Sequence, residues 1–254
     1  RTVLELEIKW YENSKSAVES FKTLRDKISQ AGVIVMMSGI VGNNTHRPLD
    51  INEFRAFAMV DDLVPLIFIN SNDSVNGKLF SLLHEFAHIC IGNNSLYNDR
   101  YSSGTRVSKA ESVSNAVAAE ILVPQVMFEK KWKEIDKFDD PIKTIDVLTK
   151  YFSCGTTVIA RKALDNGYID YSVYRKLSQI AVNRYNEKRK KEKEQGGGGD
   201  YYRTAASRID TRFFKSLVSS VHEGKTLYTD AFRLTNTNRS TFENLVNKMG
   251  GGSK

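Results

Sequence analysis

The sequence predicts an α+β fold in which a few short strands accompany a larger number of helices. Three short apolar runs, residues 33–37, 54–60 and 66–69, are suited to the strands of a small sheet. Most other apolar residues recur at the three- and four-residue spacing of helices. A change in charge near residue 195 adds the expectation of a small, mainly helical C-terminal domain.

Helical periodicity, together with residues that begin or end helices, predicts where the helices lie along the chain. Residues 3–30 have mostly helical patterning. A polar turn at residues 70–76 precedes an apolar helix that Gly92 should end, and an Ala-rich helix beginning at Glu111 should end before Pro124. Gly155 should allow a sharp turn between two of the later helices. These later helices are expected at residues 125–133, 141–151, 156–166 and 168–195.

The charge is distributed unevenly along the chain. Residues 1–182 carry 22 basic and 22 acidic side chains, whereas residues 183–254 carry 15 basic and 8 acidic ones, so the net charge of +7 resides in the second part. The glycine run 196–199 should break the long helix before it. We therefore expect a main domain over residues 1–182, a charged helix end and Gly-rich linker over 183–199, and a small basic helical domain over 200–254.

The strongest chemical signal is a His-Glu-x-x-His pattern formed by His84, Glu85 and His88. Residues four apart lie on one face of a helix, so both imidazoles can point at one metal ion while Glu85 stands beside it. The surrounding run is apolar on most sides, as in a buried helix, and polar side chains there would be costly without a partner. The pattern therefore predicts a metal site of the kind found in zinc hydrolases.

A tetrahedral catalytic ion bound by two histidines needs one more protein ligand, and we expect it to be Glu111. Glu111 opens the Ala-rich helix and shares a face with Asn115, while the small side chains of Ser114 and Ala118 would let the two helices approach closely. The alternative is that Glu111 is simply an acidic residue favoured at a helix N-terminus. Glu120 is a rival ligand, but it lies off the face of Glu111.

In the His-Glu-x-x-His motif and the helix that begins at Glu111, the chain resembles the ImmA/IrrE metallo-endopeptidases. Among them it is most similar to the long members that carry an XRE-type helix-turn-helix ahead of the protease. This chain lacks that helix-turn-helix part, and Ser114 stands where relatives often have Cys or Ala. The resemblance implies that Glu111 is the third ligand and that the fold is zincin-like. The matching segments are residues 38–45, 48–58, 84–88, 111–124 and 197–202.

The chemistry expected of such a site is peptide hydrolysis, with Glu85 as the catalytic base that takes a proton from water and returns it to the leaving amine. The cofactor should be Zn²⁺, although Mn²⁺ or Fe²⁺ would accept the same donors. A further donor to the oxyanion or the substrate is needed, and the polar candidates in flanking loops are His46, Tyr97 and Tyr101.

Aromatic and basic residues alternate after the glycine run, a composition compatible with nucleic-acid binding. The candidate contacts are Arg203, Arg208, Arg212 and Lys215. The alternative, which the helical spacing of Phe213, Leu217 and Val221 favours, is that this part builds the core of its own small domain.

The function expected from the residues and the resemblance together is a metal-dependent, gluzincin-like endopeptidase. Its protein substrate would be an XRE-type repressor or an antitoxin, whose cleavage derepresses a phage, mobile-element, stress or defence operon. The rival expectation is a regulatory DNA- or protein-binding module with a structural or vestigial metal site. No apolar run reaches membrane-spanning length, the start of the chain lacks a signal-peptide pattern, and only two cysteines are present, so we expect a cytoplasmic protein without a membrane partner.

Overall fold

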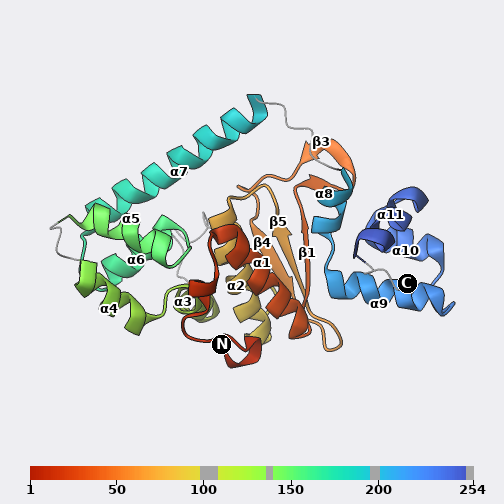
Figure 1. Ribbon diagram of the computed structural model, residues 1–254, viewed down its shortest axis with the longest axis horizontal. Helices are drawn as coiled ribbons and strands as arrows, with labels where there is room; N and C mark the ends of the chain where they lie inside the picture. Colours follow the sequence, from red (N-terminus) through yellow and green to blue (C-terminus); the bar gives the residue numbers. More distant parts are fainter. Residues whose placement is uncertain (98–107, 136–139, 195–200, 250–254) are drawn as a thin grey trace.

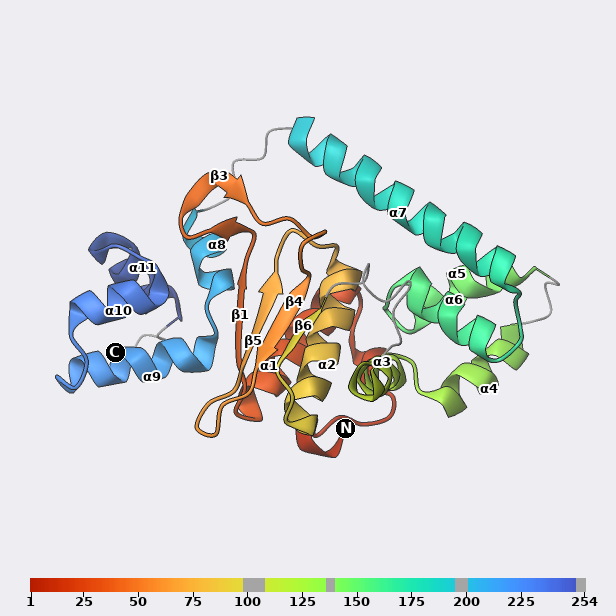
Figure 2. The same ribbon diagram turned by 180° about the vertical axis from the view of Figure 1, so that it is seen from behind.

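A four-stranded mixed sheet lies at the centre of the molecule, and two helices cover one of its faces (Figures 1 and 2). The computed structural model describes residues 1–97, 108–135, 140–194 and 201–249. The strand order is β1 (Ile34–Ser38), β5 (Leu66–Asn70), β4 (Ala56–Met59) and β6 (Ser95–Tyr97). β1 and β5 are parallel, whereas β4 pairs in an antiparallel sense with both β5 and β6. The α+β class predicted from the sequence is confirmed.

The sheet has one tightly packed face, as the alternation of its side chains shows. Ile67 and Ile69 are fully buried, whereas the alternate residue Phe68 is half-buried and stacks on Phe57 with ring centroids 5.1 Å apart. The three expected strands are confirmed within two residues at each end. No sequence pattern predicted β6 or the separate hairpin of β2 (Ile40–Val41) and β3 (Asn44–Pro48). These strands are too short or too polar for an apolar run to mark them.

The helices that cover this face are α1 (Ala17–Gln30) and α2 (Val75–Ile91). Ser74 accepts a hydrogen bond from the Gly77 amide at 2.9 Å and so starts α2, and Gly92 ends it with φ of +79°, a conformation that glycine adopts without strain. Both ends of this helix are therefore as predicted. The expectation of mostly helical structure from residue 3 was wrong for the first part: short 3₁₀ turns at Thr2–Leu4 and Trp10–Asn13 precede α1, which begins only after its Ser16 cap.

Five helices form the part of the molecule next to α2, namely α3 (Lys109–Leu122), α4 (Gln125–Ile135), α5 (Pro141–Tyr151), α6 (Thr156–Asp165) and α7 (Tyr171–Glu194). Gly155, which was expected to allow a sharp turn between α5 and α6, lies in that turn but does not take the positive φ. Ser153 takes the positive φ of +48°, and Gly155 is instead needed for space, because a Cβ there would lie 3.1 Å from Cβ of Asn76. Among the described residues, no helix has both the length and the apolar character required to cross a bilayer.

The last four helices, α8 (Tyr201–Arg208), α9 (Thr211–His222), α10 (Tyr228–Thr235) and α11 (Arg239–Met249), have a hydrophobic cluster of their own. Within the described ranges, the buried apolar side chains divide between this cluster and a larger one that contains the sheet and the earlier helices. α7 runs from Tyr171 to Glu194 and so includes the charged helix end that begins at residue 183. Two separate clusters support our proposal that the C-terminal helices are a domain.

A buried carboxylate joins the C-terminal helices to the rest of the chain. Asp210 is only 2% exposed, and it accepts hydrogen bonds from Oγ of Ser29 at 3.0 Å and from the Val35 amide at 3.2 Å. It also caps α9 by accepting from the Arg212 and Phe213 amides. Arg25 lies beside this contact and donates to three backbone carbonyls, those of Val35, Ser207 and Ile209. Burial lowers the pKa of Arg25, and the charge of Asp210 opposes that shift.

We expect Asp210→Ala to lower the free energy of unfolding by about 3 kcal/mol, because it leaves several buried donors without an acceptor. Asp230→Ala is the matched control: the half-exposed side chain of Asp230, in the first turn of α10, forms an ion pair with the exposed Arg233, so its loss should cost about 0.5 kcal/mol or less. Urea denaturation of both variants measures the difference. Equal losses would contradict a special role for the buried carboxylate.

Candidate metal centre

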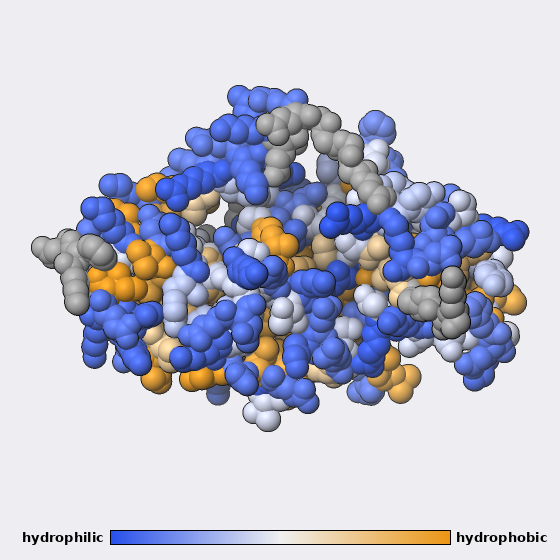
Figure 3. All heavy atoms as spheres, in the orientation of Figure 1, coloured by the Kyte–Doolittle hydropathy of each residue, from blue (hydrophilic) through white to orange (hydrophobic). Residues whose placement is uncertain are grey.

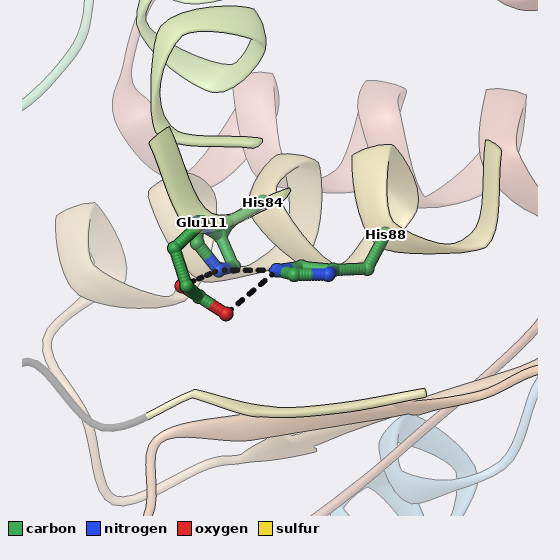
Figure 4. A group of neighbouring side chains, drawn as sticks. All are labelled: His84, His88 and Glu111. Carbon is green, nitrogen blue, oxygen red and sulfur yellow. Dashed lines mark hydrogen bonds and ion pairs between the residues drawn. The ribbon is translucent and has the colours of Figure 1, made fainter. Parts of the chain in front are cut away.

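Three side chains from two helices converge on one point, as Figure 4 shows. His84 and His88 come from α2, and Glu111 comes from α3. Nε2 of His84 lies 3.1 Å from Nε2 of His88 and 3.2 Å from Oε2 of Glu111. Nε2 of His88 lies 3.1 Å from the other carboxylate oxygen, Oε1. The structure thus brings together all three residues that the sequence nominated as ligands.

The spacing of these donor atoms suits a small divalent cation. A tetrahedral Zn²⁺ with bonds of about 2.0–2.1 Å holds its ligand atoms about 3.3–3.4 Å apart. The observed separations of 3.1–3.2 Å are close to this value. The histidine side chains are 0% and 3% exposed, whereas that of Glu111 is 37% exposed, so the site opens to solvent on the glutamate side. Two imidazoles and a carboxylate with one open side are the donor set of catalytic zinc sites.

Small side chains let α3 approach α2 closely enough to complete this set. Ser114 and Ala118 are both fully buried on the face of α3 that carries Glu111 one turn earlier. Oγ of Ser108 accepts a hydrogen bond from the Glu111 amide at 3.2 Å and starts the helix. Glu111 therefore lies in the first turn, where an acidic residue is favoured, and also next to both imidazoles. Glu111 can therefore be both an acidic residue favoured at a helix N-terminus and the third ligand of the metal site.

Asn115, one turn after Glu111, holds the first histidine in place. Nδ1 of His84 lies 3.0 Å from Oδ1 of Asn115, and because an amide oxygen can only accept, the ring donates from Nδ1 and keeps the lone pair of Nε2 toward the other donors. Contacts of this kind orient metal ligands in proteins. The sequence predicted that Asn115 shares a helix face with Glu111, but it did not predict that Asn115 accepts a hydrogen bond from His84.

Burial and the neighbouring imidazole keep His84 neutral. Removal from water, followed by the proximity of His88, lowers the pKa of His84 to about 4, against the hydrogen bond to Asn115. A neutral imidazole is the form that binds a metal, so the pocket favours the competent state at neutral pH. Nδ1 of His88 is buried and has no hydrogen-bond partner among the described residues.

Glu85, which directly follows His84 in the sequence, has a fully buried carboxyl group. Oγ of Ser95, on the edge strand β6, donates a hydrogen bond to its Oε2, while Oε1 is buried without a partner in the described part of the chain. Burial raises the pKa of Glu85 to about 8, with the hydrogen bond from Ser95 acting in the opposite direction. No sequence pattern identified Ser95, because its position depends on the pairing of β6 with β4.

Of the three residues proposed as donors to the oxyanion or the substrate, Tyr97 lies beside His84. The ring of Tyr97 stands 4.2 Å from that of His84, centroid to centroid, and Phe80 lies 6.2 Å from both rings. His46 lies instead on the exposed strand β3 of the separate hairpin, at the edge of the molecule in Figure 1. Tyr101 lies outside the described residues.

Glu120, the rival ligand, makes a different set of contacts. Its carboxylate accepts from Nζ of Lys162 at 2.8 Å and from the Gln125 amide, and it also forms an ion pair with Arg1. Hydrogen bonds and the charges of Lys162 and Arg1 lower the pKa of Glu120 despite its partial burial. This residue therefore connects α3 to the start of α4 and to α6, away from the group formed by Glu111.

The four basic candidates for nucleic-acid contact have separate environments. Arg203 and Lys215 are exposed on α8 and α9, and Arg208 is half-buried at the end of α8. Arg212 donates from Nη1 to the carbonyls of Ser29 and Gln30 at the end of α1. Its guanidinium group therefore joins the C-terminal helices to the main part of the molecule.

Comparison with known protein families gives two matches. Residues 32–164 match the IrrE N-terminal-like domain, and residues 209–248 match a domain of unknown function (DUF8813). The first match spans the sheet, the three converging side chains and the helices as far as α6, which is more than half of the chain. The chain therefore belongs to the IrrE N-terminal-like family, of the ImmA/IrrE type.

This membership agrees with the resemblance seen in the sequence and is that of a metallopeptidase-like family, which implies a divalent metal. The group of His84, His88 and Glu111 could hold such an ion. No curated protein and no solved structure matches the chain.

We expect Glu111→Gln to lower the affinity for Zn²⁺ more than ~100-fold, since the loss of an outer contact alone typically costs 10–100-fold. Glu120→Gln is the matched control, because it makes the same change on the same helix away from the converging side chains. Competition with a chromophoric chelator measures both affinities. If Glu120→Gln weakened binding as much as Glu111→Gln, the assignment of the third ligand would be wrong.

Asn115→Ala should weaken Zn²⁺ binding by about 10- to 100-fold, because the His84 ring would lose the acceptor that fixes its tautomer. Asn115→Asp keeps an acceptor and should restore most of the affinity. The same chelator competition applies, with circular dichroism to compare the folds. Equal affinities for the alanine variant and the wild type would show that Asn115 does not orient the ligand.

Proposed function

We propose that this protein is a metal-dependent endopeptidase that uses Zn²⁺, held by His84, His88 and Glu111, to hydrolyse a peptide bond in a protein substrate. The three donor atoms, their spacing and the open side of the site support the metal centre. Membership of a metallopeptidase-like family supports the reaction class. Mn²⁺ or Fe²⁺ would fit the same donors.

The observation that carries this proposal is the buried carboxyl group of Glu85, adjacent to His84 in the same helix. A structural metal site is closed by its ligands and needs no general base. Burying a carboxyl group with one oxygen unpaired is costly, and a chain with only a structural metal site would gain nothing from it. The same residue argues against the rival function, a regulatory binding module with a structural or vestigial metal site.

The chain's own residues supply the proton transfers and the orientation. When bound, the divalent cation would lower the pKa of water and polarise the scissile carbonyl. The positive charge of a bound cation would counteract the burial that raises the pKa of Glu85, and so would favour its ionised form. The ionised Glu85 takes the proton from water and delivers it to the nitrogen of the leaving amine. Ser95 holds one oxygen of Glu85 from β6, and Asn115 keeps the His84 ring in the required tautomer. Tyr97 packs against that ring and restricts its rotation.

For the substrate, we propose a DNA-binding repressor or antitoxin of the helix-turn-helix type. Its cleavage would derepress a phage, mobile-element, stress or defence operon in the cytoplasm. The resemblance to the ImmA/IrrE metallo-endopeptidases supports this choice, and the family match over residues 32–164 supports the family membership on which the choice rests.

The test is incubation of the zinc-loaded protein with the repressors encoded beside its gene, followed by mass spectrometry of the products. Glu85→Gln should slow cleavage by about 10²- to 10⁴-fold, because it removes the general base, while the zinc content stays the same. Glu120→Gln is the matched control and should cleave at the wild-type rate. Equal rates for Glu85→Gln and the wild type would contradict the mechanism.

A further inference from the structure

The last two helices have the design of a helix-turn-helix unit. α10 has eight residues, and three residues, Asn236, Thr237 and Asn238, join it to α11. Asn236 takes the left-handed conformation with φ of +52°, which turns the chain sharply, and Oδ1 of Asn238 accepts from the Thr241 amide at 2.8 Å to start α11. Two helices joined by a three- or four-residue turn of this kind are typical of DNA-binding proteins.

The burial pattern of α11 separates an inner face from a polar outer face. Thr241, Phe242 and Leu245 are buried against α9 and α10. The opposite face holds only polar side chains, and all but the half-buried Asn244 are exposed: Arg239, Ser240, Glu243, Asn244 and Asn247. Arg, Ser, Glu and Asn are the side-chain types that hydrogen-bond to base edges in the major groove. A recognition helix presents its first turns to the bases, and this face begins at the first residue of α11.

A second helix pair in the same chain provides an internal comparison. α5 and α6 are also joined by a short turn with a left-handed residue, Ser153. α7 packs along α6, however, and most of α6 is buried or half-buried, including Lys162 at 8% exposure. The exposed side chains of α6 are Thr157, Arg161 and Asp165, whereas α11 exposes Arg239, Ser240, Glu243, Asn247 and Lys248.

The exposed hairpin β2–β3 lies next to the turn between α10 and α11. Nδ2 of Asn43, in the hairpin turn, donates to the carbonyl of Asn236 at 2.8 Å, although the two residues are 193 positions apart. All five residues of β3 are exposed, including His46 and Arg47, so neither face of this strand packs on the core. A polar hairpin held against the start of an exposed helix extends the surface that this helix offers to a partner.

Hydrogen bonds through Asn72 connect the hairpin with α7 near its basic end. Tyr185 donates to the carbonyl of Asn72, and Nδ2 of Asn72 donates to the carbonyls of Gly39 at 2.6 Å and Leu49 at 2.9 Å, on the two sides of the hairpin. In Figures 1 and 2, β3 lies between the end of α7 and the C-terminal helices. This helix end is hydrophilic in Figure 3, and among its described side chains the basic ones outnumber the exposed acidic ones, Glu187 and Glu194. The basic residues are Arg184, Lys188, Arg189, Lys190 and Lys191.

We propose that the outer face of α11, the hairpin β2–β3 and the basic end of α7 form one binding surface for duplex DNA. α11 would enter the major groove, and the hairpin and α7 would contact the phosphates on either side. The polar face of α11 favours this partner over an apolar protein groove, because it offers hydrogen bonds and no apolar side chain. A polar helix face suits the major groove of a duplex, and the exposed tyrosines Tyr201 and Tyr228 lie on α8 and α10 rather than on this face of α11.

The experiment measures fluorescence anisotropy of a labelled random-sequence duplex pool of about 30 bp with the full chain, between about 50 and 200 mM salt. Wild type should bind in the micromolar range at low salt and lose affinity as salt rises. Arg239→Glu on α11 and Arg47→Glu on the hairpin should each weaken binding about tenfold.

Arg175→Glu is the matched control, since Arg175 is an exposed arginine near the opposite end of α7 and the substitution changes the net charge by the same amount. It should change the affinity less than about twofold, and thermal melting should show that all three variants keep the wild-type fold. Each of three results would overturn the proposal: no duplex binding by the wild type at low salt, equal losses for Arg175→Glu and the two test variants, or tighter binding of single-stranded RNA than of the duplex.

Discussion

The close approach of α3 to α2 is the constraint on which the candidate site depends. His84 and His88 are fixed relative to each other by the helical repeat alone, but Glu111 reaches them only because Ser114 and Ala118 leave room between the two helices. A larger side chain at either position would push α3 outward, and the carboxylate would move with it. The geometry of the site is thus a property of helix packing as much as of the His-Glu-x-x-His motif.

Polar contacts between segments distant in sequence attach α3 and the C-terminal helices to the rest of the molecule. Glu120 and Lys162 connect α3 to α6, so the helix that carries Glu111 is anchored at its far end as well. Asp210 does the same for the C-terminal helices, which it attaches to α1 and β1. The candidate site and the proposed DNA surface therefore belong to one connected framework. A protease that also contacts DNA would meet a DNA-bound repressor at the place where that repressor acts.

The sequence predicted the elements whose signal is local and missed those whose formation depends on distant pairing. The ends of α2, the bounds of α5 and the three longest apolar strands follow from caps, prolines and periodicity, and the structure has them as expected. β6 and the hairpin β2–β3 carry no apolar signature, so only their pairing reveals them. The first sixteen residues show the opposite error: helical spacing there reflects packing of 3₁₀ turns onto the core rather than a continuous helix.

In the candidate site, too, the residues with a local sequence signal were predicted and those that depend on distant contacts were not. His84 and His88 follow from their spacing, and Glu111 follows from the need for a third donor on a second helix. The hydrogen bonds that His84 donates to Asn115 and Ser95 donates to Glu85 depend on contacts that no motif encodes. For the same reason, His46 could be nominated from its residue type, but its position on the exposed strand β3 could not be predicted, because it depends on the pairing of that hairpin.

X-ray absorption spectroscopy at the zinc edge of the metal-loaded protein tests the central claim most directly. The account predicts two imidazole nitrogens and light oxygen donors, each about 2.0–2.2 Å from the metal, with one oxygen donor lost in Glu111→Gln. A first shell containing sulfur, or one that is unchanged by the loss of the Glu111 carboxylate, would contradict it.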